Sequence, residues 1–143
     1  MAKINIIYWS GTGNTEKMAE LILEGIKSKG IDAEMKSVSE ATIEDVLSSE
    51  ALALGCPSMG SEELEEGEMQ PFIESIEDKI SGKKLALFGS YGWGDGLWMR
   101  EWEDRMKDNG ADLIQDGLII NGFPESDEDE SSCIELGKKL VNS

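Results

Sequence analysis

The chain has 143 residues, the size of one ordinary domain, and its 30 acidic and 13 basic residues give a formal net charge of −17. This charge excludes a nucleic-acid-binding surface, which would be basic, and disfavours contact with anionic membranes. Because the sequence contains no histidine, catalytic triads and imidazole acid–base chemistry are excluded, and any chemistry would have to come from a bound cofactor.

Neither a metal site nor export is indicated by the sequence. Cys56 and Cys133 lack the spacing of a metal or redox site. The chain opens directly into a strand pattern and holds no apolar run of membrane-spanning length. We therefore expect a cytoplasmic protein without a metal, formed by one domain that covers residues 1–143.

Strand and helix patterns alternate along the chain, because apolar residues recur either in short runs or at helical spacing. In chain order, the first half predicts a strand at 4–9, a helix that ends near Gly30, a short edge strand at 33–38, a brief helix at 43–47 and a buried strand at 51–55. The second half predicts a helix from 72 to 80 with Pro71 in its first turn, a buried strand at 84–89 and a helix that carries Trp98, Trp102 and Met106. A fifth strand is predicted at 113–120. A closing helix is predicted at 132–142, and the acidic stretch 126–130 is its expected start.

Five strands separated by helices predict an α/β fold of parallel βαβ units with right-handed crossovers. In such a sheet, a ligand binds beyond the carboxyl ends of the strands. Residues 10–15, 56–68 and 90–97 form loops at these ends, so they are the candidate binding loops.

The loop after the first strand has the composition of an anion-binding site. It reads Ser10-Gly11-Thr12-Gly13-Asn14-Thr15, and a helix follows directly. Its glycines allow close approach of a ligand, the helix start presents N–H groups, and the side chains add further donors. Glu16 stands where a dinucleotide fingerprint needs glycine, and no lysine follows Gly13 as a Walker loop requires. The loop therefore predicts a phosphate site without a cation, although a tight turn with an ordinary helix cap would also explain it.

Two further segments follow the third and fourth strands, Gly55-Cys56-Pro57-Ser58-Met59-Gly60 and Gly89-Ser90-Tyr91-Gly92-Trp93-Gly94. With the first loop, and in this order, they resemble the loops of flavodoxins of the short-chain bacterial type. The resemblance covers nearly the whole chain. It implies a flavodoxin-like, doubly wound three-layer sandwich with a five-stranded parallel sheet of order 2-1-3-4-5. It also implies a low-potential one-electron carrier that uses non-covalently bound FMN and shuttles electrons between redox proteins, rather than an enzyme.

The resemblance also assigns roles to loop residues. The first loop would bind the FMN phosphate, Trp93 would stack on one face of the isoalloxazine ring, and Met59 would cover the other. Pro57 stands where relatives offer a serine hydroxyl. Glu62 would lie near flavin N3, and the Gly60–Ser61 peptide would reverse toward the N5–H of the reduced flavin. The expected cofactor-binding residues are Ser10, Gly11, Thr12, Gly13, Asn14, Thr15, Pro57, Ser58, Met59, Gly60, Ser61, Glu62, Ser90, Tyr91, Gly92, Trp93 and Gly94.

Some residues have a second interpretation. Trp98, Trp102 and Cys56 are expected in the core, whereas Trp9 could support the flavin site or fill the core. The acids from 62 to 68 could recognise partners or only be solvated. An FMN-dependent NAD(P)H or quinone reductase is the main alternative function. A phospho-accepting receiver domain is disfavoured, because Ser10-Gly11 and Cys56-Pro57 stand where it needs acids.

The acidic charge favours partners with basic docking faces. We expect a monomer that interacts with redox proteins such as ferredoxin-type reductases or oxidoreductases, and with neither nucleic acid nor membrane.

Overall fold

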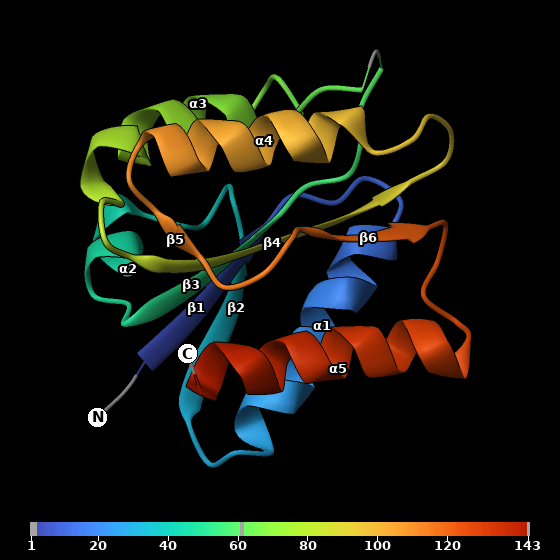
Figure 1. The fold of residues 1–143 in the computed structure, drawn as a ribbon, viewed down its shortest axis with the longest axis horizontal. Helices are drawn as coiled ribbons and strands as arrows, with labels where there is room; N and C mark the ends of the chain where they lie inside the picture. The colour runs from blue at the N-terminus through green and yellow to red at the C-terminus, as the bar shows by residue number, and fades with distance from the viewer. Residues whose placement is uncertain (1–2, 61, 143) are drawn as a thin grey trace.

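The computed structural model describes residues 3–60 and 62–142, so Ser61 and its expected contacts lie outside the described residues. Strands and helices alternate as predicted (Figure 1). In chain order they are β1 (Lys3–Tyr8), α1 (Asn14–Lys27), β2 (Asp32–Ser37), α2 (Ile43–Leu47), β3 (Ala51–Gly55), α3 (Met69–Ile76), the 3-10 turn η1 (Glu77–Lys79), β4 (Lys84–Tyr91), α4 (Leu97–Asp108), β5 (Asp112–Leu113), β6 (Leu118–Asn121) and α5 (Asp127–Asn142).

All pairings in the sheet are parallel, and the strand order is β2-β1-β3-β4-β5, with β6 also paired to β4. The predicted order 2-1-3-4-5 is therefore confirmed. β5 pairs with the beginning of β4, at Lys84 and Leu85, and β6 pairs with its end, from Phe88 to Tyr91. Two short strands thus share the fifth position of the sheet.

The predicted continuous strand over 113–120 is wrong, because the chain turns out of the sheet between β5 and β6. The Gly117 N–H donates to the Glu103 carboxylate of α4. A Cβ at Gly117 would overlap the Met99 side chain of α4, so any other residue here would require that side chain to move. Asp116-Gly117 is a common turn dipeptide, and here it outweighs the strand propensity of its apolar neighbours.

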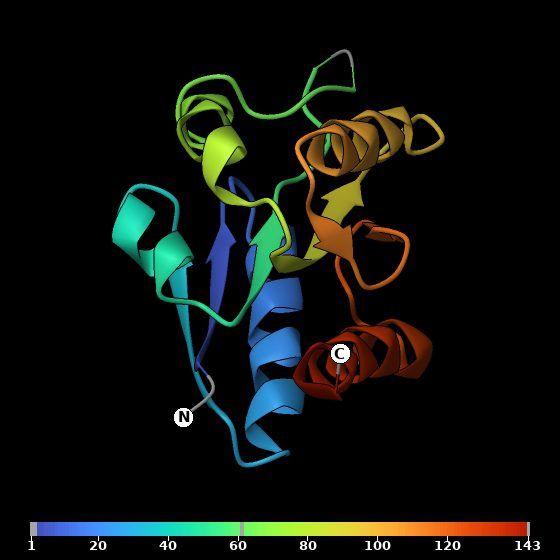
Figure 2. The same ribbon diagram turned by 60° about the vertical axis from the view of Figure 1, so that its left-hand side comes forward.

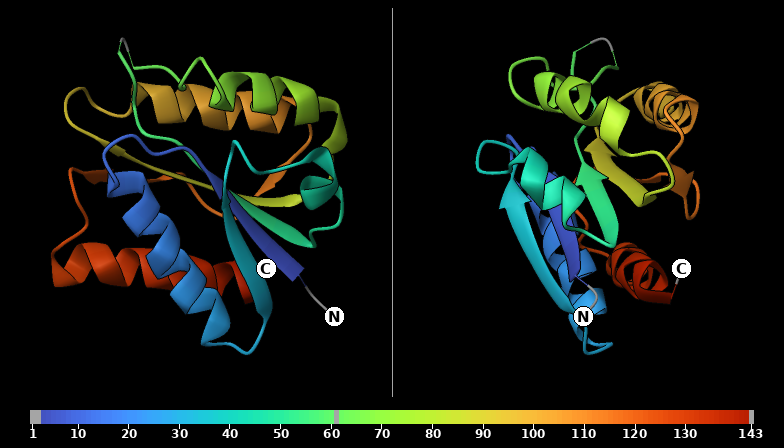
Figure 3. Two further views of the ribbon diagram at one scale, coloured as in Figure 1. Left: turned by 180° about the vertical axis from the view of Figure 1, so that it is seen from behind. Right: turned by 90° about the vertical axis from the view of Figure 1, so that its left-hand side faces the viewer.

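Helices cover both faces of the sheet (Figures 2 and 3). Residues of α1 and α5 form one core cluster with one face of the sheet, and residues of α2, α3 and α4 form another with the opposite face. Trp98 and Trp102 are each 1% exposed in the second cluster, which confirms that they belong to the core. The fold therefore has the expected three layers.

The helices α1 and α5 approach each other closely at two glycines. A Cβ at Gly25 would overlap the carbonyl oxygen of Ile134, and a Cβ at Gly137 would overlap that of Ile22. The two backbones can meet at this separation only where no side chain intervenes. In the part of the chain that the structure describes, no helix is long and apolar enough to cross a membrane.

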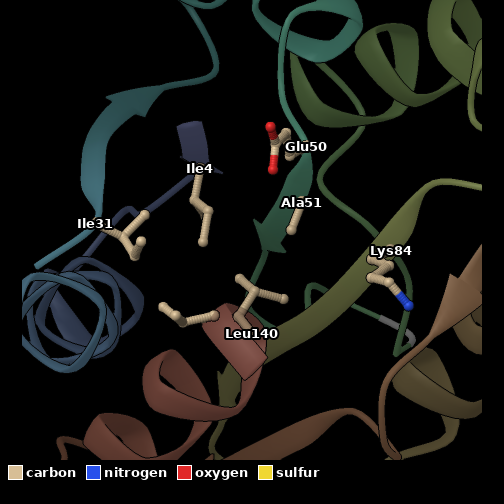
Figure 4. A pocket seen from close by; sticks show the side chains of 7 residues that line it. Ile4, Ile31, Glu50, Ala51, Lys84 and Leu140 are labelled. Carbon is tan, nitrogen blue, oxygen red and sulfur yellow. The ribbon is translucent and has the colours of Figure 1, made fainter. Parts of the chain in front are cut away.

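A hollow of about 130 Å³ lies at the edge of the sheet where the strands begin (Figure 4). We call it the amino-edge hollow, and it is lined by Ile4, Ile31, Glu50, Ala51, Lys84, Leu140 and Val141. Ile4 lies near the start of β1 and Val141 near the end of α5, so both ends of the described chain meet there. The candidate binding loops lie at the opposite edge.

Candidate functional site

The three candidate loops meet at the carboxyl edge of the sheet, after β1, β3 and β4. A pocket of about 210 Å³ opens between them. Residues from all three loops line this site pocket: Trp9, Gly11, Thr12, Pro57, Ser58, Met59, Ser90 and Tyr91. The structure therefore brings together segments that lie far apart in the sequence, at the place that the topology predicts for a ligand.

The first loop turns directly into α1 and presents donors there. Gly13 has a φ of +96°, a conformation that residues with side chains rarely adopt. The Ser10 hydroxyl oxygen accepts from the N–H groups of Gly13 and Glu16, at 3.1 and 3.3 Å. The N–H groups of Asn14 and Thr15 belong to the first helical turn, where no intrahelical acceptor is in reach. Together with the helix dipole, they form a site for an anion.

Thr15 links the first loop to the third. Its residue is 1% exposed, and its hydroxyl lies 3.1 Å from that of Ser90. The Ser90 N–H also donates to the Thr15 hydroxyl oxygen, at 3.4 Å. Part of the hydrogen-bonding capacity of Thr15 is therefore used within the protein, and its contact with a phosphate stays a prediction.

The second loop contains a tight turn beside the site pocket. Met59 and Glu63 exchange both backbone hydrogen bonds, at 2.9 and 3.0 Å. Gly60 is exposed within this turn and has a φ of +46°, which glycine adopts readily. Met59 is half-buried and lines the pocket, and its expected position over a flavin stays a prediction.

Glu62 belongs to the second loop, but its side chain reaches the start of α4. The residue is buried, with 9% of its surface exposed. Its carboxylate accepts from the N–H groups of Gly96 and Leu97, at 3.2 and 3.1 Å, where the helix dipole favours a negative charge. Its φ of +58° is unusual for a residue with a side chain, and a Cβ at Gly94 would overlap the carboxyl group. Glu62 thus joins the second loop to the third, and its contact with flavin N3 stays a prediction.

The third loop is supported from the core. Tyr91 packs on Trp98 with ring centroids 5.9 Å apart, and Trp98 Nε1–H donates to the Cys56 carbonyl at 3.1 Å. Cys56 is fully buried, and burial raises the pKa of its thiol to about 12, so the expected packing role is confirmed. Trp93 is 63% exposed and is not among the described residues that line the site pocket. Its stacking on a flavin stays a prediction.

Comparison with known proteins identifies the family. The sequence model of the flavodoxin family matches residues 6–135. A flavodoxin from Clostridium beijerinckii is 55% identical over 139 residues, which cover 97% of this chain and 99% of that protein. The chain belongs to the flavodoxin family. A flavodoxin from Megasphaera elsdenii is 45% identical over 140 residues, 98% of this chain and 99% of that protein. The solution structure of two-electron reduced Megasphaera elsdenii flavodoxin has a TM-score of 0.89 and 44% identity, and covers 98% and 99% of the two chains.

Flavodoxins bind FMN and carry electrons between redox proteins. This chain is therefore an FMN-binding electron carrier rather than an enzyme. The family, fold class, cofactor and function predicted from the sequence are confirmed. The roles of individual residues toward FMN are not settled by these relationships, and they stay predictions.

The residues of the site pocket fit a flavin that carries a terminal phosphate. The rings of Trp9 and Tyr91 and the thioether of Met59 give the pocket apolar walls, which suit a flat aromatic ring. The N–H groups at the start of α1 lie beside it and suit an anion. The described residues contain no cluster of three or more His, Cys, Asp or Glu side chains that could hold a metal ion.

Two acids of the second loop make contacts that no sequence pattern indicated. Glu68 accepts from the indole N–H of Trp9 at 3.2 Å. The carboxylate of Glu65 accepts from the backbone N–H groups of Gly67, Glu68 and Met69, at 2.8, 2.7 and 2.9 Å. Glu65 therefore caps α3 from four residues before its first residue, a position that no common capping motif predicts. Burial raises the pKa of Glu65, but the three N–H groups outweigh this effect, so that the pKa is lowered overall.

Replacing Glu65 with glutamine should destabilise the protein near pH 7 by about 1–2 kcal/mol, because glutamine keeps one acceptor oxygen but leaves the Gly67 N–H without its partner and removes the charge that strengthens the other two bonds. Because the pKa of Glu65 is lowered in the folded state, its contribution is present above the pKa of the unfolded chain and is lost as the pH falls. The difference between wild type and Glu65→Gln should therefore become smaller at a pH well below the unfolded-state pKa of a glutamate, which is about 4.3. Urea denaturation at both pH values measures it. Glu66→Gln, at an exposed neighbour, should change stability at either pH by less than about 0.5 kcal/mol.

Proposed function

We propose that FMN binds in the site pocket with its phosphate at the first loop and its ring against the second and third loops. The observation that carries this placement is the apolar pocket that adjoins an anion site at the start of α1. Ser10, Thr12, Asn14 and Thr15 would supply the phosphate donors. Residues 1–143 would act as one FMN-binding domain.

The second and third loops would enclose the flavin ring. Met59 would cover one face and Trp93 the other, while Ser58, Gly92 and the backbone of Ser90 would border its edges. When bound, FMN supplies the ability to accept and release electrons. The protein residues would bind the ring, limit its contact with water, and surround it with the acids of the second loop.

A visible absorption spectrum tests this assignment directly. The purified protein, or the apoprotein mixed with FMN, should show flavin bands and should bind one FMN per chain. The purified protein alone should not oxidise NAD(P)H in the steady state, which separates a carrier from a reductase. A colourless protein that does not bind added FMN would contradict the proposal.

We further propose that the carrier is a cytoplasmic monomer whose partners, reductases or oxidoreductases of the ferredoxin type, present basic docking faces. The net charge of −17 supports long-range steering toward such partners. Glu63 and Glu66 are exposed on the second loop, and the Glu63 backbone pairs with that of Met59, which lines the site pocket. In this respect they differ from Glu62 and Glu65, whose carboxylates accept hydrogen bonds from backbone N–H groups.

Electron transfer to a basic redox protein should slow steeply as the salt concentration rises, because exposed charges are screened over about 10 Å at 0.1 M. The double variant Glu63→Gln/Glu66→Gln should be slower at low salt and should show a weaker salt dependence. Stopped-flow measurement of the association rate at several ionic strengths gives both results.

A matched control removes two acids from the opposite edge of the sheet. Glu24 lies in the last turns of α1 and Asp32 at the start of β2, and both are exposed. Glu24→Gln/Asp32→Asn changes the net charge equally, so it should alter the salt dependence much less. If the two double variants behaved alike, only the total charge would matter, and the second loop would have no special role in docking.

A further inference from the structure

Trp9 follows β1 directly and is one wall of the site pocket. Its half-buried indole lies against the first loop, since a Cβ at Gly11 would come within 3.0 Å of the Trp9 Cη2 atom. On the other side, Trp9 Nε1–H donates to Glu68 Oε1 at 3.2 Å. The indole is therefore held between a glycine of the first loop and an acid at the end of the second.

The backbone of Glu68 is itself well fixed. Glu68 is the residue that precedes α3, its N–H donates to the Glu65 carboxylate at 2.7 Å, and its carbonyl accepts from the Phe72 N–H at 3.1 Å. Glu68 is exposed, so its hydrogen bond with Trp9 lies at the surface, but the fixed backbone limits the positions that its carboxylate can take. The hydrogen bond from the indole N–H to this carboxylate favours one orientation of the Trp9 ring beside Gly11.

We propose that Glu68 is a positioning residue for the FMN pocket. It holds the Trp9 indole in place as a wall of the pocket and, through it, joins the second loop to the first. This inference rests on the proposed placement of FMN in the site pocket, but the contact between Trp9 and Glu68 exists in the protein itself and is measurable without FMN.

Three variants separate the hydrogen bond from the charge. Glu68→Ala removes the acceptor, Glu68→Gln removes the charge but keeps an acceptor oxygen, and Trp9→Phe keeps an aromatic ring but removes the donor. Glu68→Ala and Trp9→Phe should each raise the FMN dissociation constant by roughly threefold to tenfold, the range expected for one hydrogen bond. Glu68→Gln should raise it by less than about twofold, and the double variant Trp9→Phe/Glu68→Ala should bind no more weakly than the weaker single variant.

Amide hydrogen exchange of the apoprotein supplies a reading that does not depend on FMN. Exchange should accelerate at residues 9–12 and 66–69 in Glu68→Ala, and should stay near wild type in Glu68→Gln. If glutamine were as harmful as alanine, the charge of Glu68 rather than its hydrogen bond would matter. If the two single variants had additive effects, Trp9 and Glu68 would act independently. Either result would overturn the inference. Faster exchange with an unchanged FMN dissociation constant would also overturn it, because Trp9 would then not be a wall of the FMN site. Loss of FMN binding by the wild type would instead contradict the proposed function.

Discussion

FMN should bind at least about a hundredfold more tightly than riboflavin, which has the same ring and side chain but no phosphate. The first loop contains no lysine or arginine, so in the proposed site the phosphate would be held by hydrogen bonds from Ser10, Thr12, Asn14 and the first turn of α1. A hydrogen bond to a charged group contributes roughly 1.5–3 kcal/mol. Two such bonds already correspond to a factor of about a hundred or more in affinity, at 1.4 kcal/mol per tenfold change.

Quenching of flavin fluorescence on titration with apoprotein measures both affinities under one set of conditions. Equal dissociation constants for FMN and riboflavin would show that the first loop does not hold the phosphate. A single substitution refines the test, because Thr15→Val should weaken FMN binding by roughly 1–3 kcal/mol. The riboflavin affinity of this variant is the control, since it reports any change that reaches the ring through the lost contact with Ser90.

Gly25→Ala and Gly137→Ala should each destabilise the protein by roughly 1–3 kcal/mol, the range measured for overpacked cores. Helix propensity alone predicts the opposite, because alanine is favoured over glycine inside a helix by about 1 kcal/mol. The added methyl group would overlap a carbonyl oxygen of the facing helix at both positions, so α1 and α5 would have to separate. We expect this separation to outweigh the gain in propensity.

Urea denaturation of the single and double variants tests this prediction. Once one methyl group has pushed the helices apart, the second should cost less, so the double variant should be more stable than the sum of the single effects predicts. Gly92→Ala is the control for stability, because Gly92 has no positive φ and nothing within 4 Å of the added Cβ. An increase in stability of Gly25→Ala would mean that the helices yield easily and that the glycines are not needed for packing.

The sequence predicted the layers and the strand order well, because both depend on patterns that extend over many residues. The alternation of apolar runs and helical spacing predicted β1 to β4 in their places, and the glycine-rich segments predicted the loops that form the site pocket. The break between β5 and β6 was missed, since the apolar residues around Asp116-Gly117 read as one strand, while the contact of Gly117 with Glu103 is a tertiary one.

The contacts inside the site were less predictable for the same reason. Glu62, Glu65 and Glu68 are neighbours in one acidic loop, and nothing in their spacing distinguishes them from Glu63 and Glu66. In the structure, the first three accept hydrogen bonds from α4, from the start of α3 and from Trp9. Only the fold decides which acids of a charged loop are structural and which are free to meet solvent or a partner.

The amino-edge hollow has a consequence for how this unit can be combined with others. Because Ile4 and Val141 line the same hollow, β1 starts and α5 ends on the side of the molecule that faces away from the site pocket (Figures 1 and 4). A second module tethered at either end would therefore lie beyond the amino edge of the sheet and leave the loops around Met59 and Trp93 accessible. A covalent fusion to an electron donor or acceptor could then be built through either end, with the reach of the linker setting how often the two redox centres meet.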